Sequence, residues 1–142
     1  MDVLSSRTII HPSDLDRSLA FYRDGLGLAV AREFGHGEHR GVVFFAGGGL
    51  IEVVGGDRSR SGLSGGTGGV ALWLQVRSVA ESLAELADGG VPATRPAILE
   101  PWGLIEAWVD DPDGLRIHLV EVPEDHPLRR DLREAAAGRD RP

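Results

Sequence analysis

Apolar and polar residues alternate in several short stretches of the chain, which are separated by breaks rich in glycine and proline. An alternation with a period of two predicts strands. In the first half we expect strands at residues 7–11, 28–34, 40–46 and 50–54. In the second half we expect them at residues 70–76, 104–109 and 115–120, and either strand or loop at residues 93–99.

Three other stretches have the pattern of helices. Apolar residues recur at helical spacing between residues 15 and 25, after Ser13 and Asp14, either of which can cap a helix. A capping box at residues 78–81 begins a second helix, which we expect to end near residue 88. A third, short helix is predicted at residues 128–137.

The chain contains an internal repeat. Residues 18–25 return at residues 82–89, 64 positions later, with five of the eight residues identical. Each half has the predicted order βαβββ, so we expect an α+β fold of two tandem modules. Each module is expected to be a curved mixed sheet with a helix on its outer face, and the two sheets to form a cleft. The expected boundaries are a first module at residues 1–54, a Gly/Ser-rich linker at 55–69, a second module at 70–122 and a helix and tail at 123–142, in one structural domain overall.

Composition excludes several kinds of chemistry. The chain has 142 residues and a formal net charge of −7, without a basic stripe, so nucleic acid is not an expected partner. It has no cysteine, and all 15 basic residues are arginine, which excludes thiol and lysine Schiff-base catalysis. No leader and no apolar run of membrane-spanning length is visible, so no membrane partner is expected and a cytoplasmic location is predicted.

Each strand presents two rows of side chains, one to each face of its sheet. In residues 70–76 one row is wholly apolar and belongs under the helix, while the other, Ala71, Trp73 and Gln75, is mixed. We call the face that carries such a row the mixed face. Two mixed faces that meet would enclose a cleft lined by Arg7, His11, Glu52, Trp73, Gln75, Arg116 and His118, with Phe44 and Trp108 as aromatic walls.

Residues 11–18, Phe21, Tyr22, residues 25–28 and the Asp-Pro-Asp-Gly turn at 111–114 together resemble the vicinal oxygen chelate superfamily. That superfamily includes glyoxalase I, bleomycin-resistance proteins, fosfomycin-resistance enzymes and extradiol dioxygenases. The resemblance implies paired βαβββ modules and a homodimer, often with each cleft shared between two chains. It does not select one activity, because the superfamily contains lyases, isomerases, dioxygenases, transferases and non-catalytic drug binders.

The resemblance also implies where a divalent metal (nickel, zinc, iron or manganese) would bind. The matching positions here are Arg7, Glu52, Ala71 and His118. Arginine and alanine have no lone pair to offer, so only Glu52 and His118 can be ligands. His11 is a candidate for completing a set with these two residues.

Two functions remain open from the sequence. The first is a small-molecule binder without a metal or other cofactor, in which Arg7, Glu52 and His118 orient an aromatic or partly anionic ligand. In this reading Arg7 and Glu52 form an ion pair, with His118 hydrogen-bonded beside it. The second is a metal-dependent lyase, isomerase or dioxygenase in which Glu52 and His118, with or without His11, are catalytic.

Trp102 is expected in a loop, as a lid or a partner anchor. Ligand identity, and whether the modules pair within or between chains, stay open.

Overall fold

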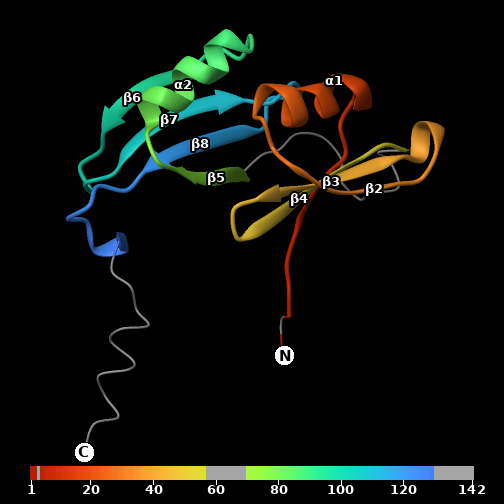
Figure 1. Cartoon of the computed structure of the whole chain (residues 1–142), viewed down its shortest axis with the longest axis horizontal. Helices are drawn as coiled ribbons and strands as arrows, with labels where there is room; N and C mark the ends of the chain where they lie inside the picture. The colour runs from red at the N-terminus through yellow and green to blue at the C-terminus, as the bar shows by residue number, and fades with distance from the viewer. Residues whose placement is uncertain (3, 57–69, 130–142) are drawn as a thin grey trace, which may run out of the picture.

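The computed structural model describes residues 1–2, 4–56 and 70–129 (Figure 1). Most of the predicted linker at 55–69 and most of the predicted helix at 128–137 therefore lie outside the described residues. Within them, two separate sheets of four strands each are present. None of the described helices is both long enough and apolar enough to cross a membrane.

The first module forms one sheet with the strand order β1-β4-β3-β2. The pairing of β1 with β4 is parallel, and the other pairings are antiparallel. Its elements are β1 (Thr8–Ile10), α1 (Leu15–Ala20), a π-helical turn (Phe21–Gly25), β2 (Val30–Phe34), a 3-10 turn (Gly37–His39), β3 (Gly41–Ala46) and β4 (Gly49–Val54).

The second module repeats this topology with the order β5-β8-β7-β6. Its elements are β5 (Ala71–Val76), α2 (Val79–Asp88), β6 (Arg95–Leu99), β7 (Ile105–Asp110) and β8 (Arg116–Glu121), followed by a 3-10 turn (Pro127–Arg129). The ambiguous stretch around Pro96 is thus a strand, and its pairing with β7 is irregular between Arg95 and Ile98. The predicted pair of βαβββ modules is confirmed.

Both helices begin at residues whose side chains bind a free backbone N–H of the first turn. The carboxylate of Asp14 accepts from the N–H of Arg17 at 3.0 Å, and Ser78 Oγ accepts from the N–H of Glu81 at 3.2 Å. Of the two predicted caps of α1, Asp14 is therefore the one used. Ser13 instead donates its N–H to Asp113 Oδ2 of the second module at 3.0 Å.

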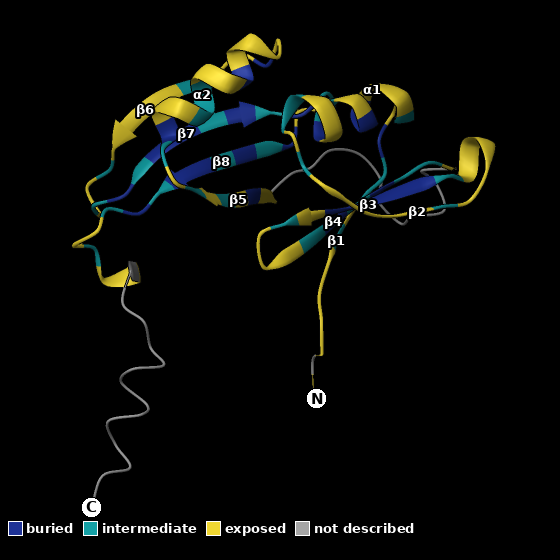
Figure 2. Cartoon of the chain, in the orientation of Figure 1, coloured by how far each residue is buried: buried dark blue, intermediate teal, exposed yellow. Residues whose placement is uncertain are grey.

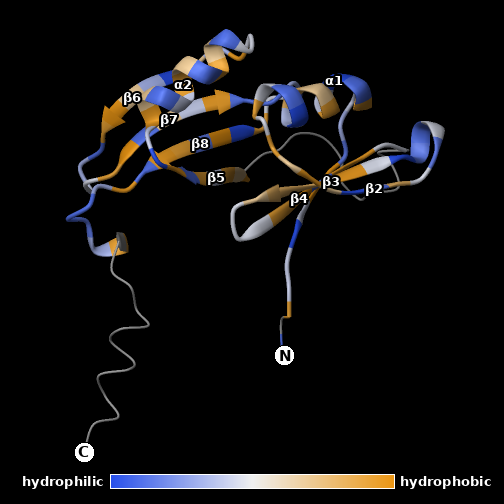
Figure 3. Ribbon diagram, viewed as in Figure 1, coloured by the Kyte–Doolittle hydropathy of each residue, from blue (hydrophilic) through white to orange (hydrophobic). Residues whose placement is uncertain are grey.

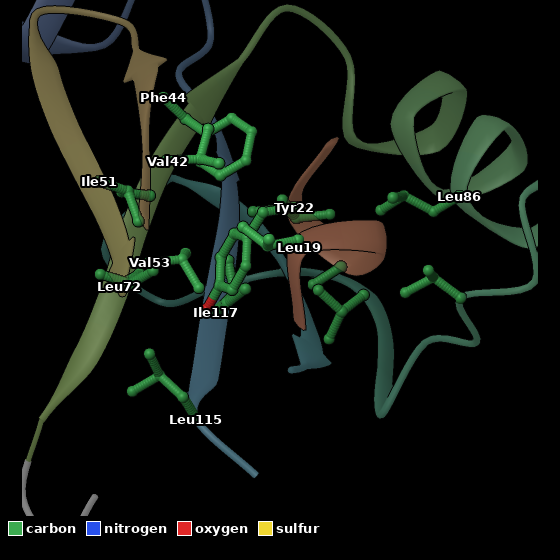
Figure 4. Close-up of a cluster of buried hydrophobic side chains, with 14 of the residues drawn as sticks. Leu19, Tyr22, Val42, Phe44, Ile51, Val53, Leu72, Leu86, Leu115 and Ile117 are labelled. Atoms are coloured by element: carbon green, nitrogen blue, oxygen red, sulfur yellow. The ribbon is translucent and has the colours of Figure 1, made fainter. Parts of the chain in front are cut away.

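The two modules share one hydrophobic core on the helix side of the sheets. Leu19 and Tyr22 from the first module belong to the same buried cluster as Leu72, Leu115 and Ile117 from the second (Figure 4). Figure 2 shows the same arrangement, with the buried stretches of the strands below the helices and the outer turns of α1 and α2 exposed. The modules are therefore joined within one chain through their helix-covered faces.

A buried hydrogen bond crosses the same junction. The hydroxyl of Tyr22 donates to Asp111 Oδ2 at 2.8 Å, and both residues are buried. The other oxygen of Asp111 accepts from the backbone N–H groups of Asp113 and Leu115, each at 2.9 Å. This carboxylate closes the turn before β8 and at the same time fastens that turn to the first module.

The opposite, mixed face of each sheet is open. In β5 the row formed by Ala71, Trp73 and Gln75 is exposed, whereas the alternate residue Leu72 is buried. In the first sheet Ile9 is 49% exposed and Phe45 is 54% exposed. Hydropathy divides the helices in the same sense, with hydrophilic residues on their outer turns (Figure 3). Within a single chain the mixed faces are thus exposed around Ile9, Phe45 and Trp73, whereas Val43, Glu106 and Val120 on the same faces are buried.

Candidate functional site

On the first sheet, an ion pair occupies the mixed face. Arg7 precedes β1, and Glu52 lies on β4 directly opposite Ile9 in the parallel register. Arg7 Nη1 donates to Glu52 Oε2 at 2.7 Å, and the two side chains are 42% and 14% exposed. The Arg7–Glu52 pair expected from the sequence is present. His11, just beyond the end of β1, is partly buried.

On the second sheet, His118 has a different partner from the one expected. His118 Nδ1 lies 3.4 Å from Glu106 Oε2, on the neighbouring strand β7. The expectation that His118 is hydrogen-bonded beside Arg7 and Glu52 is therefore wrong for the single chain. The reason is topological, because Glu52 and His118 belong to two sheets that share no strand pairing.

Glu106 is a site residue that was not predicted from the sequence, as are Arg95 and Asp110. Glu106 is only 6% exposed, and its second oxygen, Oε1, accepts a hydrogen bond of 2.9 Å from Trp102 Nε1. The available signal was the alternation along residues 104–109, which places Glu106 in the same row as Trp108. Trp102, expected in a loop as a lid or anchor, lies in the turn before β7 with its indole N–H bound to this carboxylate.

Trp108 is enclosed by charged side chains. Arg95 Cζ lies 4.0 Å from the centre of its ring and Arg116 Cζ lies 4.6 Å from it. The His118 ring is 5.3 Å away, tilted by 50°. Such cation–π contacts stabilise each guanidinium over the ring. Trp108 is on the mixed face as predicted, but its neighbours occupy the space where a planar ligand would stack.

Each of these two arginines also has a carboxylate partner. Arg116 Nε donates to Asp110 Oδ1 at 2.5 Å, and this hydrogen bond raises the pKa of Arg116. Arg95 is paired with Glu100. Two buried donors in this group, Arg95 Nε and the indole Nε1 of Trp108, have no hydrogen-bond partner within the described part of the chain.

Phe44 does not line the mixed face, which corrects the prediction. It is fully buried on the helix side, with its ring centre 6.3 Å from that of Tyr22. In the registers, Val43 lies opposite Glu52 as Trp108 lies opposite His118, so Val43 is the true counterpart of Trp108. A shift of one residue moves a side chain to the other face of a strand. The exposed aromatic residue on the first mixed face is Phe45.

Two aromatic side chains of the second module are exposed, Trp102 in the turn before β7 and Trp73 on β5. Trp73 is 50% exposed and lies opposite His118 in the pairing of β5 with β8. Trp73 and the exposed Gln75 also line a hollow of about 930 Å³ beside the free edge of β5. The residues around this hollow include Arg77 and Glu85 but not Glu52 or His118.

The residues at the positions where the family resemblance implies metal ligands do not fit a divalent metal. Arg7 and Ala71 supply no lone pair, and the remaining two, Glu52 and His118, are engaged by Arg7 and Glu106 respectively. Among the residues that the structure describes, no group of three or more His, Cys, Asp or Glu side chains is placed to hold a metal. The hypothetical set of Glu52, His11 and His118 is therefore not assembled within one chain.

Comparison with known proteins gives matches that extend over most of the chain. Residues 6–119 match the family model of the Glyoxalase/Bleomycin resistance protein/Dioxygenase superfamily. A relative from Salmonella typhimurium, named lactoylglutathione lyase, is 31% identical over 124 residues, which cover 82% of this chain and 91% of the relative.

Solved structures agree with the family match. A member of the glyoxalase/bleomycin resistance protein/dioxygenase superfamily from Sphaerobacter thermophilus has 30% identity and a TM-score of 0.66, over 84% of this chain and 98% of the other. A glyoxalase-related enzyme from Fulvimarina pelagi has 25% identity and a TM-score of 0.68, over 87% and 90% of the two chains.

Proposed function

Because the chain belongs to the Glyoxalase/Bleomycin resistance protein/Dioxygenase superfamily, we propose that it binds a small aromatic or partly anionic molecule on its mixed faces without a catalytic metal. The observation that carries this proposal is the Arg7–Glu52 pair. An arginine stands at a position where the superfamily places a metal ligand, and it holds the carboxylate that would be another ligand. A guanidinium at this position favours an anion over a cation.

The aromatic character of the ligand is inferred from Trp73. Its ring is half exposed and lies beside His118, whereas the ring of Trp108 is already covered by Arg95 and Arg116. A planar ligand can therefore stack on the exposed indole of Trp73. Such ring contacts contribute about 0.5–1.5 kcal/mol beyond burial of area. The other exposed indole among the described residues, that of Trp102, is 57% exposed and is hydrogen-bonded to Glu106.

We also propose that the cleft is completed by a second copy of the chain. The helix-covered faces of the two modules join within one chain, so the mixed faces are not closed against each other there. Exposed Ile9, Phe45 and Trp73 mark these faces as surfaces for association. A homodimer that seats the first module of one chain on the second module of the other brings Arg7 and Glu52 toward the partner's His118. Sedimentation equilibrium tests this, and a monomer at micromolar concentration would refute it.

The binding proposal is tested by calorimetry with a hydroxynaphthoate, which carries a planar ring system and a carboxylate. We expect saturable binding to the native protein, weakened in Trp73→Ala by about 2- to 12-fold, as the loss of ring contacts predicts. Leu99→Ala is the matched control, because Leu99 is an exposed apolar residue on the other face of its sheet. Equal affinity of Trp73→Ala and Leu99→Ala would contradict the assignment of Trp73.

A second candidate function is a metal-dependent lyase, isomerase or dioxygenase that uses Glu52 and His118, with or without His11. The relative named lactoylglutathione lyase, at 31% identity, favours this candidate. Its test is an assay for the formation or cleavage of lactoylglutathione with added nickel or zinc. Activity that disappears in Glu52→Gln would establish the enzyme and overturn the metal-free proposal.

A further inference from the structure

Glu106 differs from the neighbouring carboxylates of the second mixed face because it has no arginine partner among the described residues. Glu100 and Asp110 are each bound to an arginine. Glu106, in contrast, meets the indole N–H of Trp102 through Oε1 and the imidazole Nδ1 of His118 through Oε2. It is also the most buried of the three, with a side chain 8% exposed.

These contacts determine which nitrogen of His118 carries the proton. An ionised carboxylate has no proton to donate and only accepts hydrogen bonds. An ionised Glu106 therefore requires Nδ1, the nitrogen that faces it at 3.4 Å, to be the donor. In a neutral imidazole one nitrogen donates and the other accepts, so Nε2 is left with a free lone pair.

The side chain of Glu106 is also held in place by Trp102, which in turn contacts His126. Trp102 donates its indole N–H to Oε1 at 2.9 Å. The backbone carbonyl of Trp102 in turn lies 3.0 Å from His126 Nε2, in the segment that follows β8. His126 Nδ1 accepts from the N–H of Leu128 at 3.2 Å, so Nε2 is the protonated nitrogen and donates to Trp102. Glu106 is thus held by a chain of contacts that does not depend on a ligand.

We propose that Glu106 is a positioning residue, which holds His118 as the Nδ1–H tautomer so that Nε2 accepts a hydrogen bond from a hydroxyl or N–H group of the ligand. His118 is 28% exposed and lies beside the open ring of Trp73, so a group attached to a stacked ring is within its reach. This second half rests on the proposed function, because it needs a ligand on Trp73. The tautomer itself does not.

The tautomer is measured by nitrogen-15 NMR of the histidine rings of the native protein at a pH at which the imidazole is neutral. The signals of His118 are assigned by their loss in His118→Gln. We expect a protonated Nδ1 and an unprotonated Nε2 in the native protein. In Glu106→Leu we expect this pattern to be lost, and in Glu106→Gln, whose side-chain carbonyl still accepts, to be recovered at least in part. A protonated Nε2 in the native protein would overturn the proposal.

The ligand half is tested by comparing a hydroxynaphthoate with its methyl ether, which has the same ring and carboxylate but no donor. We expect the hydroxyl compound to bind the native protein about 2- to 10-fold more tightly, the effect of one neutral hydrogen bond. In Glu106→Leu the two should bind alike. Equal binding to the native protein would overturn the ligand half. If neither compound binds while the tautomer is as expected, the proposed function fails and the positioning role of Glu106 stands.

Discussion

Arg7, directly before β1, and Glu52, on the neighbouring strand β4, are joined by a hydrogen-bonded ion pair of 2.7 Å between Nη1 and Oε2. The carboxylate is the less exposed partner, at 14% against 42% for the guanidinium. The pair therefore neutralises a partly buried negative charge, while the guanidinium stays partly exposed to solvent. This arrangement, at a position where the family resemblance implies a metal ligand, is the basis of the metal-free proposal.

The Arg7–Glu52 pair should contribute modestly to stability. Because Arg7 is well exposed, we expect Arg7→Leu to lower the free energy of unfolding by about 0.2–1 kcal/mol. Urea unfolding measures this. Arg23→Leu is the matched control, because the Arg23–Glu33 pair is exposed on both sides, at 43% and 65%, and its loss should be smaller still. If Arg23→Leu lowered the free energy of unfolding more than Arg7→Leu does, partial burial of Glu52 would not be what strengthens the Arg7–Glu52 pair.

Tyr22 should remain un-ionised in strongly alkaline solution. Burial, followed by the neighbouring Asp111 carboxylate, raises the pKa of Tyr22 far above its ordinary value of 10.0. Tyr22 is the only tyrosine in the sequence, so tyrosinate absorbance reports on this residue alone. We expect that absorbance to appear only when the chain unfolds. Its appearance at pH 10 in a protein that is still folded would contradict the buried Tyr22–Asp111 contact.

The same shift makes stability depend on pH. Above pH 10 the unfolded chain loses the Tyr22 proton while the folded chain keeps it, so the free energy of unfolding falls as pH rises, by up to about 1.4 kcal/mol per pH unit. Below pH 10 neither state ionises and the contribution is constant. In Tyr22→Phe the decline above pH 10 should be absent. The chain contains no lysine or cysteine that would mask it.

Phe44 and Phe45 should respond in opposite ways to substitution. Phe44 is fully buried, and Phe44→Ala should lower the free energy of unfolding by about 3–5 kcal/mol. Phe45 is 54% exposed on the mixed face, so Phe45→Ala should change the stability of the chain by no more than about 0.5 kcal/mol. It should instead weaken dimerisation, measured by sedimentation. A stability loss in Phe45→Ala as large as that in Phe44→Ala would refute the face assignment.

A metal site should be obtainable by replacing the two residues that lack lone pairs. The double variant Arg7→His with Ala71→His, together with native Glu52 and His118, supplies four donors at the positions that the family resemblance implies, and the proposed homodimer would bring these donors together. We expect it to bind zinc or nickel stoichiometrically in calorimetry. The control, Arg7→Leu with Ala71→Leu, removes the same ion pair without adding ligands and should bind none. Equal metal binding by both double variants would contradict the position assignments.

The module architecture was predictable because it is encoded locally and twice. Strand alternation, the helix caps at Asp14 and Ser78 and the repeated helix segment are all visible along the chain, and the structure confirms them. The Arg7–Glu52 pair was also predictable, since parallel pairing of β1 with β4 places both side chains on one face.

The second mixed face was less predictable because its contacts depend on strand register. The repeat has an offset of 64 at the helices but 65 at Val43 and Trp108, and that single residue decided the wrong placement of Phe44. Arg95 reaches Trp108 from β6, whose pairing is irregular next to Pro96. Glu106 was missed for a related reason. Its role depends on contacts with Trp102 and His118, and no local sequence pattern reveals these contacts.

The most direct test of the metal-free account is the metal content of the native protein purified without chelator, followed by calorimetric titration with nickel and zinc. With Arg7 bound to Glu52, we expect no stoichiometric metal after purification and no saturable heat of binding at the site. Stoichiometric nickel, zinc, iron or manganese that disappears in both Glu52→Ala and His118→Ala would contradict the account.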